Sequence, residues 1–134
     1  MATRSPRETL LIVDDELLVR RVMTRALAKP GRRIVGVSSG KAALEACRRA
    51  RPDLIVADVM MPGMNGVDLC RRLRAEEATR RIPILIVTCL ASPQLEAEGL
   101  LRGADACLGK PFQTKELAAR VDELLAKARE DGRA

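Results

Sequence analysis

Three aspartates and one lysine follow apolar segments of the chain, and their side chains suit metal and phosphate chemistry. Asp14 and Asp15 follow the first segment, Asp58 follows the second and Lys110 follows the third. The apolar segments are residues 10–13, 54–57 and 106–108. Carboxylates resist being brought together, because like charges repel and each group loses hydration. A fold that gathers them therefore predicts a site for a divalent cation, with the lysine balancing the remaining charge.

The segments that position these residues alternate between strand and helix patterns. Strands are predicted at residues 9–13, 34–37, 54–57, 84–87 and 105–108, and helices at 16–28, from 38 or 39 to about 50, after 66, from 92, and at 113–129. Leu17, Leu18, Val22 and Leu27 give the first helix its periodicity. Strands that are apolar almost throughout are typical of a parallel sheet covered by helices on both faces.

We therefore expect an α/β fold, with a doubly wound five-stranded parallel sheet of order 2-1-3-4-5 flanked by five helices, of the flavodoxin-like type. One domain is predicted over residues 8–129, with flexible ends at 1–7 and 130–134. Ligands of such sheets bind beyond the carboxyl ends of the strands, where the strand order reverses. That location would bring the aspartates, the lysine and Thr88, which ends the fourth predicted strand, to one edge.

The residue types at this edge could support phosphoryl transfer. Mg²⁺ prefers oxygen ligands, which the carboxylates provide. Asp58 could act as a nucleophile and form an acyl phosphate, while Thr88 and Lys110 stabilise the phosphoryl oxygens. Taken singly, each residue has an ordinary alternative role, because an aspartate after a strand commonly caps the next helix, as Asp14 or Asp15 could.

Composition excludes several other functions. The 134 residues include no histidine, so the chain has no histidine-based catalytic group or phosphohistidine of its own. Phe112 is the only aromatic residue, which leaves almost no surface for stacking nucleobases. The four cysteines form no C-x-x-C pair, and we expect buried or half-buried thiols rather than a zinc site.

Charge and hydropathy bear on partners and location. The net charge of +6 fits an acidic partner, nucleic acid or merely an arginine-rich solvated surface, and the last is the most common case. No apolar stretch is long enough for a membrane span, and the first eight residues lack the apolar core of a signal peptide. We therefore expect a cytoplasmic protein without a membrane partner.

Four motifs in order resemble the receiver domain of two-component response regulators. They are Leu-Ile-Val-Asp-Asp-Glu at 11–16, Asp-Val-Met-Met-Pro-Gly-Met-Asn-Gly at 58–66, Ile-Val-Thr at 86–88 and Gly-Lys-Pro-Phe at 109–112. The resemblance covers about residues 8–128. It implies that Asp58 is the phospho-acceptor of a phosphorelay, with a histidine kinase or histidine phosphotransfer domain as donor.

The same resemblance assigns roles to the other site residues. Asp15 and Asp58 would hold Mg²⁺ directly, Asp14 would act partly through water, and the Met60 carbonyl would be a further ligand. Thr88 and Lys110 would contact the phosphoryl group, and the Lys110–Pro111 bond would be cis. Such a domain is not an enzyme in its own right, although it assists its own phosphorylation and dephosphorylation.

The output expected from the resemblance is a change in partner binding. The fourth helix, fifth strand and fifth helix, here about residues 92–129, would bind a downstream protein or a second copy of the chain after phosphorylation. Direct binding of nucleic acid is not expected. Whether the chain stands alone or belongs to a longer regulator is left open.

Two positions depart from the pattern of the family. Cys107 stands three residues before Lys110, where an aromatic residue that takes part in switching is usual. Cys89 follows Thr88, where alanine or glycine is common, and its larger side chain predicts a longer-lived acyl phosphate.

Two other kinds of protein remain possible from the sequence. An aspartate-nucleophile phosphatase generally carries a second acid two residues after the nucleophile, where this chain has Met60. A binding module that works without phosphorylation and merely retains the acidic pocket is the other alternative, and the missing aromatic residue keeps it open.

Overall fold

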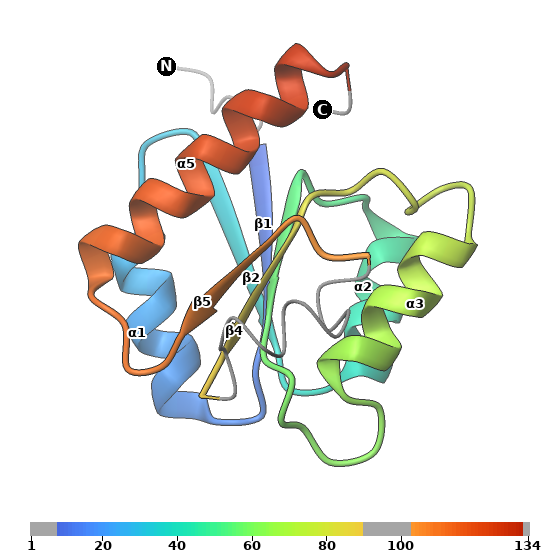
Figure 1. The fold of residues 1–134 in the computed structure, drawn as a ribbon, viewed down its shortest axis with the longest axis horizontal. Helices are drawn as coiled ribbons and strands as arrows, with labels where there is room; N and C mark the ends of the chain where they lie inside the picture. The colour runs from blue at the N-terminus through green and yellow to red at the C-terminus, as the bar shows by residue number, and fades with distance from the viewer. Residues whose placement is uncertain (1–7, 90–102, 133–134) are drawn as a thin grey trace, which may run out of the picture.

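The structure is a computed structural model and describes residues 8–89 and 103–132 of the chain. Its strands form one parallel sheet in the order β2-β1-β3-β4-β5, which confirms the predicted topology (Figure 1). The strands are β1 (Glu8–Val13), β2 (Arg32–Val37), β3 (Leu54–Ala57), β4 (Ile84–Thr88) and β5 (Ala106–Gly109).

Helices cover both faces of this sheet. Within the described residues they are α1 (Leu17–Leu27), α2 (Gly40–Arg49), α3 (Gly66–Ala75) and α5 (Thr114–Glu130). These are four of the five predicted helices, and the predicted helix that begins at Ser92 lies outside the described residues. Helices α1 and α5 lie on one side of the sheet and α2 and α3 on the other (Figure 1). None of the helices in 8–89 and 103–132 combines the length and apolar character needed to cross a bilayer.

The central strands are buried on both faces, as their apolar sequences predict. Leu10 and Ile12 pack into the cluster that includes α1 and α5, whereas Leu11 and Val13 pack into the cluster that includes α2 and α3. Successive side chains of a strand point to opposite faces, so a strand covered on both sides must be apolar at every position. The sheet therefore forms a rigid base whose strand ends carry the site.

The helix starts follow from local capping. The Ser39 hydroxyl accepts a hydrogen bond from the Ala42 amide at 3.1 Å and so caps α2, which agrees with the helix start predicted at 38 or 39. Asn65 and Asp68 form a reciprocal capping box at the start of α3. Helix α5 packs on the sheet through one apolar face, whose buried residues are Leu117, Val121, Leu124, Leu125 and Ala128.

Helix α1 faces the sheet differently from what its most apolar residues suggest. Met23 and Leu27 are buried, but Leu17, Leu18 and Val22 are 51%, 73% and 48% exposed. The helix has a second apolar stripe that is not used in the core. This stripe lies on the helix that follows Asp14 and Asp15 directly.

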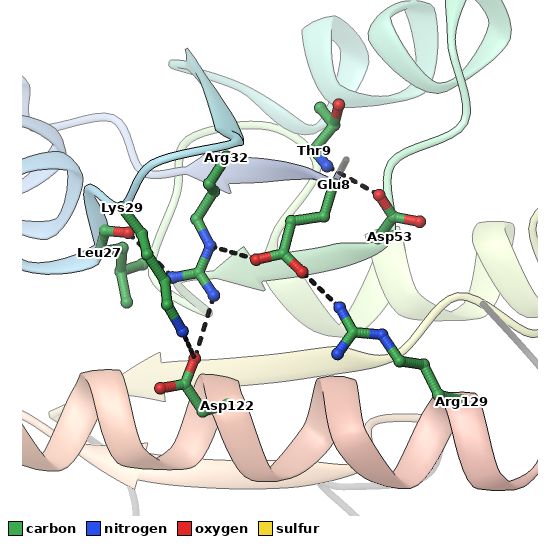
Figure 2. Close-up of polar contacts among 8 residues, drawn as sticks. All are labelled: Glu8, Thr9, Leu27, Lys29, Arg32, Asp53, Asp122 and Arg129. Atoms are coloured by element: carbon green, nitrogen blue, oxygen red, sulfur yellow. Dashed lines mark hydrogen bonds and ion pairs between the residues drawn. The ribbon is translucent and has the colours of Figure 1, made fainter. Parts of the chain in front are cut away.

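Helix α5 is tied to the amino ends of β1 and β2 by a network of charged groups (Figure 2). Arg32 donates to Glu8 at 2.6 Å, to the Leu27 carbonyl at 2.9 Å and to Asp122 at 3.0 Å. Arg129 of α5 donates to the second oxygen of Glu8 at 2.6 Å. Because the Arg32 side chain is only 4% exposed, the centre of this network lies in the interior, whereas Asp122 and Arg129 lie at the surface. The network links α1 and α5 to the sheet.

Candidate functional site

The carboxyl ends of four strands meet at one edge of the sheet. Parallel registers pair Val13 of β1 with Ala57 of β3, and Thr88 of β4 with Gly109 of β5. The residues that follow these pairs are Asp14, Asp58, Cys89 and Lys110. The backbone N–H of Asp58 donates to the Val13 carbonyl at 3.0 Å, so the second strand end is fixed directly to the first.

Lys110 joins the two buried aspartates. Its ammonium nitrogen lies 3.0 Å from Asp14 Oδ2 and 3.1 Å from Asp58 Oδ2. Asp14 has no exposed surface, and the Asp58 side chain is 5% exposed. Charges that are this buried are stable only when they are paired, so the three side chains form one unit. We refer to Asp14, Asp15, Asp58 and Lys110 together as the acidic site.

The ammonium of Lys110 is held in its charged form. Burial by itself lowers the pKa of Lys110, but the hydrogen bonds and charges of Asp14 and Asp58 more than offset this, and the net effect raises that pKa. The positive charge therefore persists throughout the physiological pH range. The peptide bond between Lys110 and Pro111 is cis, which confirms the expectation from the resemblance.

The loop after β3 packs tightly around Asp58. The backbone N–H of Met60 donates to Asp58 Oδ1 at 3.2 Å, and Met60 itself is 56% exposed. A Cβ at Gly66 would lie 2.4 Å from the Asp58 carbonyl oxygen and 2.9 Å from the Val59 Cα. Only glycine allows α3 to begin this close to the acceptor loop.

Neither Asp14 nor Asp15 is the N-cap residue of α1, which was the alternative role considered for them from the sequence. Asp14 Oδ1 accepts a hydrogen bond from the Glu16 amide at 2.9 Å, while Glu16 itself is the N-cap of α1 and makes no side-chain cap. Asp15 and Glu16 are exposed. Among the described residues, Asp14, Asp15 and Glu16 offer carboxylate oxygens within 4.8 Å of one another.

This donor set fits a divalent cation. The Lys110 ammonium pairs with both Asp14 and Asp58, and the backbone bond from Asp58 to the Val13 carbonyl holds the two strand ends together. Hard cations such as Mg²⁺ take carboxylate and carbonyl oxygens and keep several waters, and exposed Asp15 leaves room for them. The predicted ligands Asp14 and Asp58 are brought together by Lys110, and Asp15 adjoins them through the chain. Among the described residues, neither the Asp15 side chain nor the Met60 carbonyl makes a hydrogen bond or ion pair with Asp58, and the Asp15 carboxylate groups instead with those of Asp14 and Glu16.

Thr88 lies at the same edge without exposed surface. Its carbonyl accepts from the Lys110 amide at 3.1 Å, so it is directly linked to the strand that delivers the lysine. The next residue, Cys89, is exposed, which corrects the expectation that all four cysteines are buried or half-buried. Cys107 is buried in the cluster between the sheet and helices α2 and α3.

Comparison with known proteins identifies the family to which this fold and its acidic site belong. The model of the response regulator receiver domain matches residues 10–122, and the chain belongs to this family. It is 41% identical over 115 residues to the DNA-binding response regulator MtrA of Mycobacterium tuberculosis H37Rv, covering 86% of this chain and 49% of MtrA. The chain therefore spans about half the length of the curated relatives it matches.

Solved structures agree with this assignment. The receiver domain of the Francisella response regulator 1452 superposes with a TM-score of 0.82 at 30% identity, covering 91% of this chain and 99% of that one. The chemotaxis response regulator CheY4 of Vibrio cholerae gives a TM-score of 0.80 at 31% identity, covering 87% and 98%. The chain is thus a receiver domain of the two-component type in both sequence and fold.

Sequence reasoning missed three residues that shape the site. Glu16 adds a third acid to the loop, and three consecutive acids were the available signal. Gly66 lies against the backbone of Asp58 and Val59, and its position as the last residue of the motif at 58–66 could have indicated this role. Arg20 of α1 donates to the Asp14 carbonyl at 2.7 Å, and nothing in the sequence pointed to it.

Proposed function

We propose that the chain is a phospho-accepting signalling receiver that takes a phosphoryl group from a partner histidine onto Asp58. The observation that carries this proposal is the ammonium of Lys110 held between buried Asp14 and buried Asp58. A carboxylate that is held beside a permanent positive charge, at the carboxyl ends of the strands, is suited to accept a phosphoryl group. The positive charge also stabilises the negatively charged oxygens of the phosphoryl group during transfer.

The transfer is balanced in its bonds and charges. A carboxylate oxygen of Asp58 attacks the phosphorus, a new O–P bond forms, and the P–N bond to the partner imidazole breaks with its electron pair remaining on nitrogen. Lys110 neutralises the phosphoryl oxygens from the side that it shares with Asp14. The Met60 amide, which donates to Asp58 Oδ1, fixes the orientation of the carboxylate. The Thr88 hydroxyl is the further donor for the phosphoryl group in this proposal.

Asp14, Asp15, Asp58 and the Met60 carbonyl would hold Mg²⁺. When bound, the ion supplies charge stabilisation for the phosphoryl oxygens. The chain's own contribution is to keep the carboxylates close despite their repulsion, which the Lys110 ammonium and the Val13–Asp58 backbone bond achieve. The domain would assist its own phosphorylation and dephosphorylation and is not otherwise an enzyme.

The partner must bring a histidine to Asp58, because the chain has none. The exposed apolar stripe of α1, formed by Leu17, Leu18 and Val22, provides a docking surface next to the acidic loop. Exposed apolar residues that cluster beside a reactive site are typical of protein contact surfaces. A helix of a histidine kinase or histidine phosphotransfer domain is the partner that we propose for it.

The output is proposed to be altered partner binding through the face that includes β5 and α5. The exposed residues of α5 include Lys115, Glu116, Arg120, Glu123 and Lys127, so the partner surface must carry both signs of charge. A downstream protein or a second copy of the chain fits this requirement. MtrA is named for DNA binding, but this chain matches half of it, and we propose no direct nucleic-acid contact for the domain.

The proposal is tested by intact mass spectrometry after incubation with acetyl phosphate, with and without Mg²⁺. We expect the wild-type protein to gain one phosphoryl group only with Mg²⁺, and Asp58→Asn to gain none. Asp53→Asn is a matched control, because Asp53 lies at the opposite end of β3 and bonds the Thr9 amide. A folded wild-type protein that binds Mg²⁺ but is never phosphorylated would favour the phosphorylation-independent binding module.

A further inference from the structure

Arg20 makes a contact with the acidic loop that the proposed chemistry does not use. Its Nη1 donates to the backbone carbonyl of Asp14 at 2.7 Å, six residues back in the chain. Each other polar group of Asp14 is already held by a separate part of the fold. Its N–H donates to the Val37 carbonyl, Oδ1 accepts from the Glu16 amide, and Oδ2 accepts from Lys110. Arg20 therefore completes the anchoring of this residue.

Holding this carbonyl also determines where Asp15 lies. The peptide group between Asp14 and Asp15 is planar, so a fixed carbonyl oxygen fixes the direction in which the Asp15 backbone leaves β1. Asp15 is exposed and has no side-chain hydrogen bond or ion pair within the described part of the chain. Its position relative to Asp14 thus depends on the backbone, which is held by Arg20 on one side and by the bond from the Glu16 amide to Asp14 Oδ1 on the other.

Gly36 on the edge strand β2 provides the path for the arginine. A Cβ at Gly36 would lie 3.5 Å from Arg20 Cδ and 3.9 Å from Nε, so the Arg20 side chain lies against β2 at this residue. An alanine would still be in ordinary contact, whereas a longer side chain would occupy the space of the stem. The guanidinium is carried from α1 over β2 to the end of β1.

We infer that Arg20 is a positioning residue for the divalent-cation site, acting through the Asp14–Asp15 backbone. Mg²⁺ requires near-ideal geometry, so its affinity depends on the groups that orient its ligands. The inference rests on the proposed Mg²⁺ site and adds a specific dependence on Arg20. Charge alone predicts the opposite effect, because a positive side chain near a cation site repels the cation and should weaken Mg²⁺ binding.

Charge repulsion by an arginine should weaken Mg²⁺ binding, whereas orientation of the Asp14–Asp15 backbone by Arg20 should strengthen it. A neighbouring arginine on the same helix separates these two effects. Arg21 is exposed and has no hydrogen bond or ion pair in the described residues, so Arg21→Gln removes the same charge without touching the loop. We expect Arg21→Gln to bind Mg²⁺ as tightly as the wild type or slightly more tightly. Arg20→Gln should bind roughly tenfold more weakly, which is the usual scale for residues that orient metal ligands. Arg20→Lys, which keeps a cationic donor, should restore part of the loss.

Gly36 gives a second route that leaves every arginine in place. Gly36→Leu should weaken Mg²⁺ binding in the same direction as Arg20→Gln, whereas Gly36→Ala should match the wild type. This pair keeps the inference testable even where Arg20→Gln folds poorly, which far-UV circular dichroism of the metal-free proteins would reveal.

Affinity is measured by isothermal titration calorimetry with MgCl₂, since the chain has no tryptophan or tyrosine to report binding by fluorescence. The Asp15 amide resonance of the metal-free proteins is a second readout, which should move in Arg20→Gln and not in Arg21→Gln. Equal affinities for Arg20→Gln and Arg21→Gln would overturn the inference while leaving the proposed function intact. Absence of Mg²⁺ binding by the wild-type protein would overturn both, and it would be seen before any variant is compared.

Discussion

Replacement of Arg32 by methionine should reveal how strongly the network at the amino ends of β1 and β2 stabilises the fold. Burial by itself lowers the pKa of Arg32, but hydrogen bonds to Asp122 and Glu8 more than offset this and raise that pKa, so the guanidinium stays charged. Methionine keeps the apolar stem while removing every donor. In this variant Glu8 would keep its hydrogen bond from Arg129, whereas the Leu27 carbonyl would lose its hydrogen bond from Arg32.

The size of the effect follows from the exposure of each partner. The bond to Glu8, whose side chain is 13% exposed, is a buried charged hydrogen bond worth about 1.5–3 kcal/mol. The loss at the Leu27 carbonyl costs about 1–3 kcal/mol. Asp122 is 50% exposed, so its share is under about 1 kcal/mol. Allowing for the apolar contacts of methionine, we expect a net loss of about 3 kcal/mol in the free energy of unfolding.

Urea unfolding followed by circular dichroism at 222 nm measures this loss. With a slope of about 2 kcal/mol per molar urea, the midpoint should fall by about 1.5 M. Arg33→Met is the control, because Arg33 is the next residue of β2, is exposed and makes no hydrogen bond or ion pair in the described residues. Its midpoint should change by less than about 0.3 M. Equal midpoints for the two variants would refute the view that the network stabilises the interior.

Three further predictions concern the site and the thiols. Gly66→Ala should slow phosphorylation by acetyl phosphate, because its Cβ would overlap the Asp58 backbone; an unchanged rate in a time course of intact mass would contradict this. In the folded protein Cys89 should react first with iodoacetamide, since it is exposed while burial raises the pKa of Cys47 and of Cys70 to about 11 and keeps them as thiols. Peptide mapping that finds Cys47 or Cys70 labelled first would be inconsistent with the structure. Cys89→Ala should lose its phosphoryl group faster than the wild type, and an equal half-life would count against shielding by this side chain.

The fold could be predicted because its information lies in short segments. Apolar strands such as 54–57 can be covered only on both faces, and that requirement leads to a parallel sheet with helices on either side. The joint position of Asp14, Asp58 and Lys110 followed from the same reasoning, since parallel strands end at one edge. Each of these inferences needs only the chain order and the direction of the strands.

Other features depend on geometry that the sequence pattern does not contain. Leu17, Leu18 and Val22 have helical spacing, yet Met23 and Leu27 form the buried side of α1. An apolar period indicates a helix but does not choose between two apolar stripes, because the choice depends on how the helix docks on the sheet.

The hydrogen bonds made by individual arginines also could not be predicted from the sequence. The sequence predicts an arginine-rich solvated surface for the chain in general, and nothing in it distinguishes Arg20 and Arg32 from the other arginines. Their bonds to Asp14, Glu8 and other groups depend on the crossing of α1, β2 and α5. A long side chain with five donors finds partners that only the assembled fold supplies.

The central claim is that Asp58 accepts the phosphoryl group, and direct mapping of the modified residue tests it. Protein treated with acetyl phosphate and Mg²⁺ is reduced with borohydride, which converts an aspartyl phosphate to homoserine, and is then digested and sequenced by mass spectrometry. We predict homoserine at position 58 and no other conversion, with none in Asp58→Asn. Homoserine at Asp14 or Asp15, or a phosphoryl group that persists in Asp58→Asn, would contradict the account.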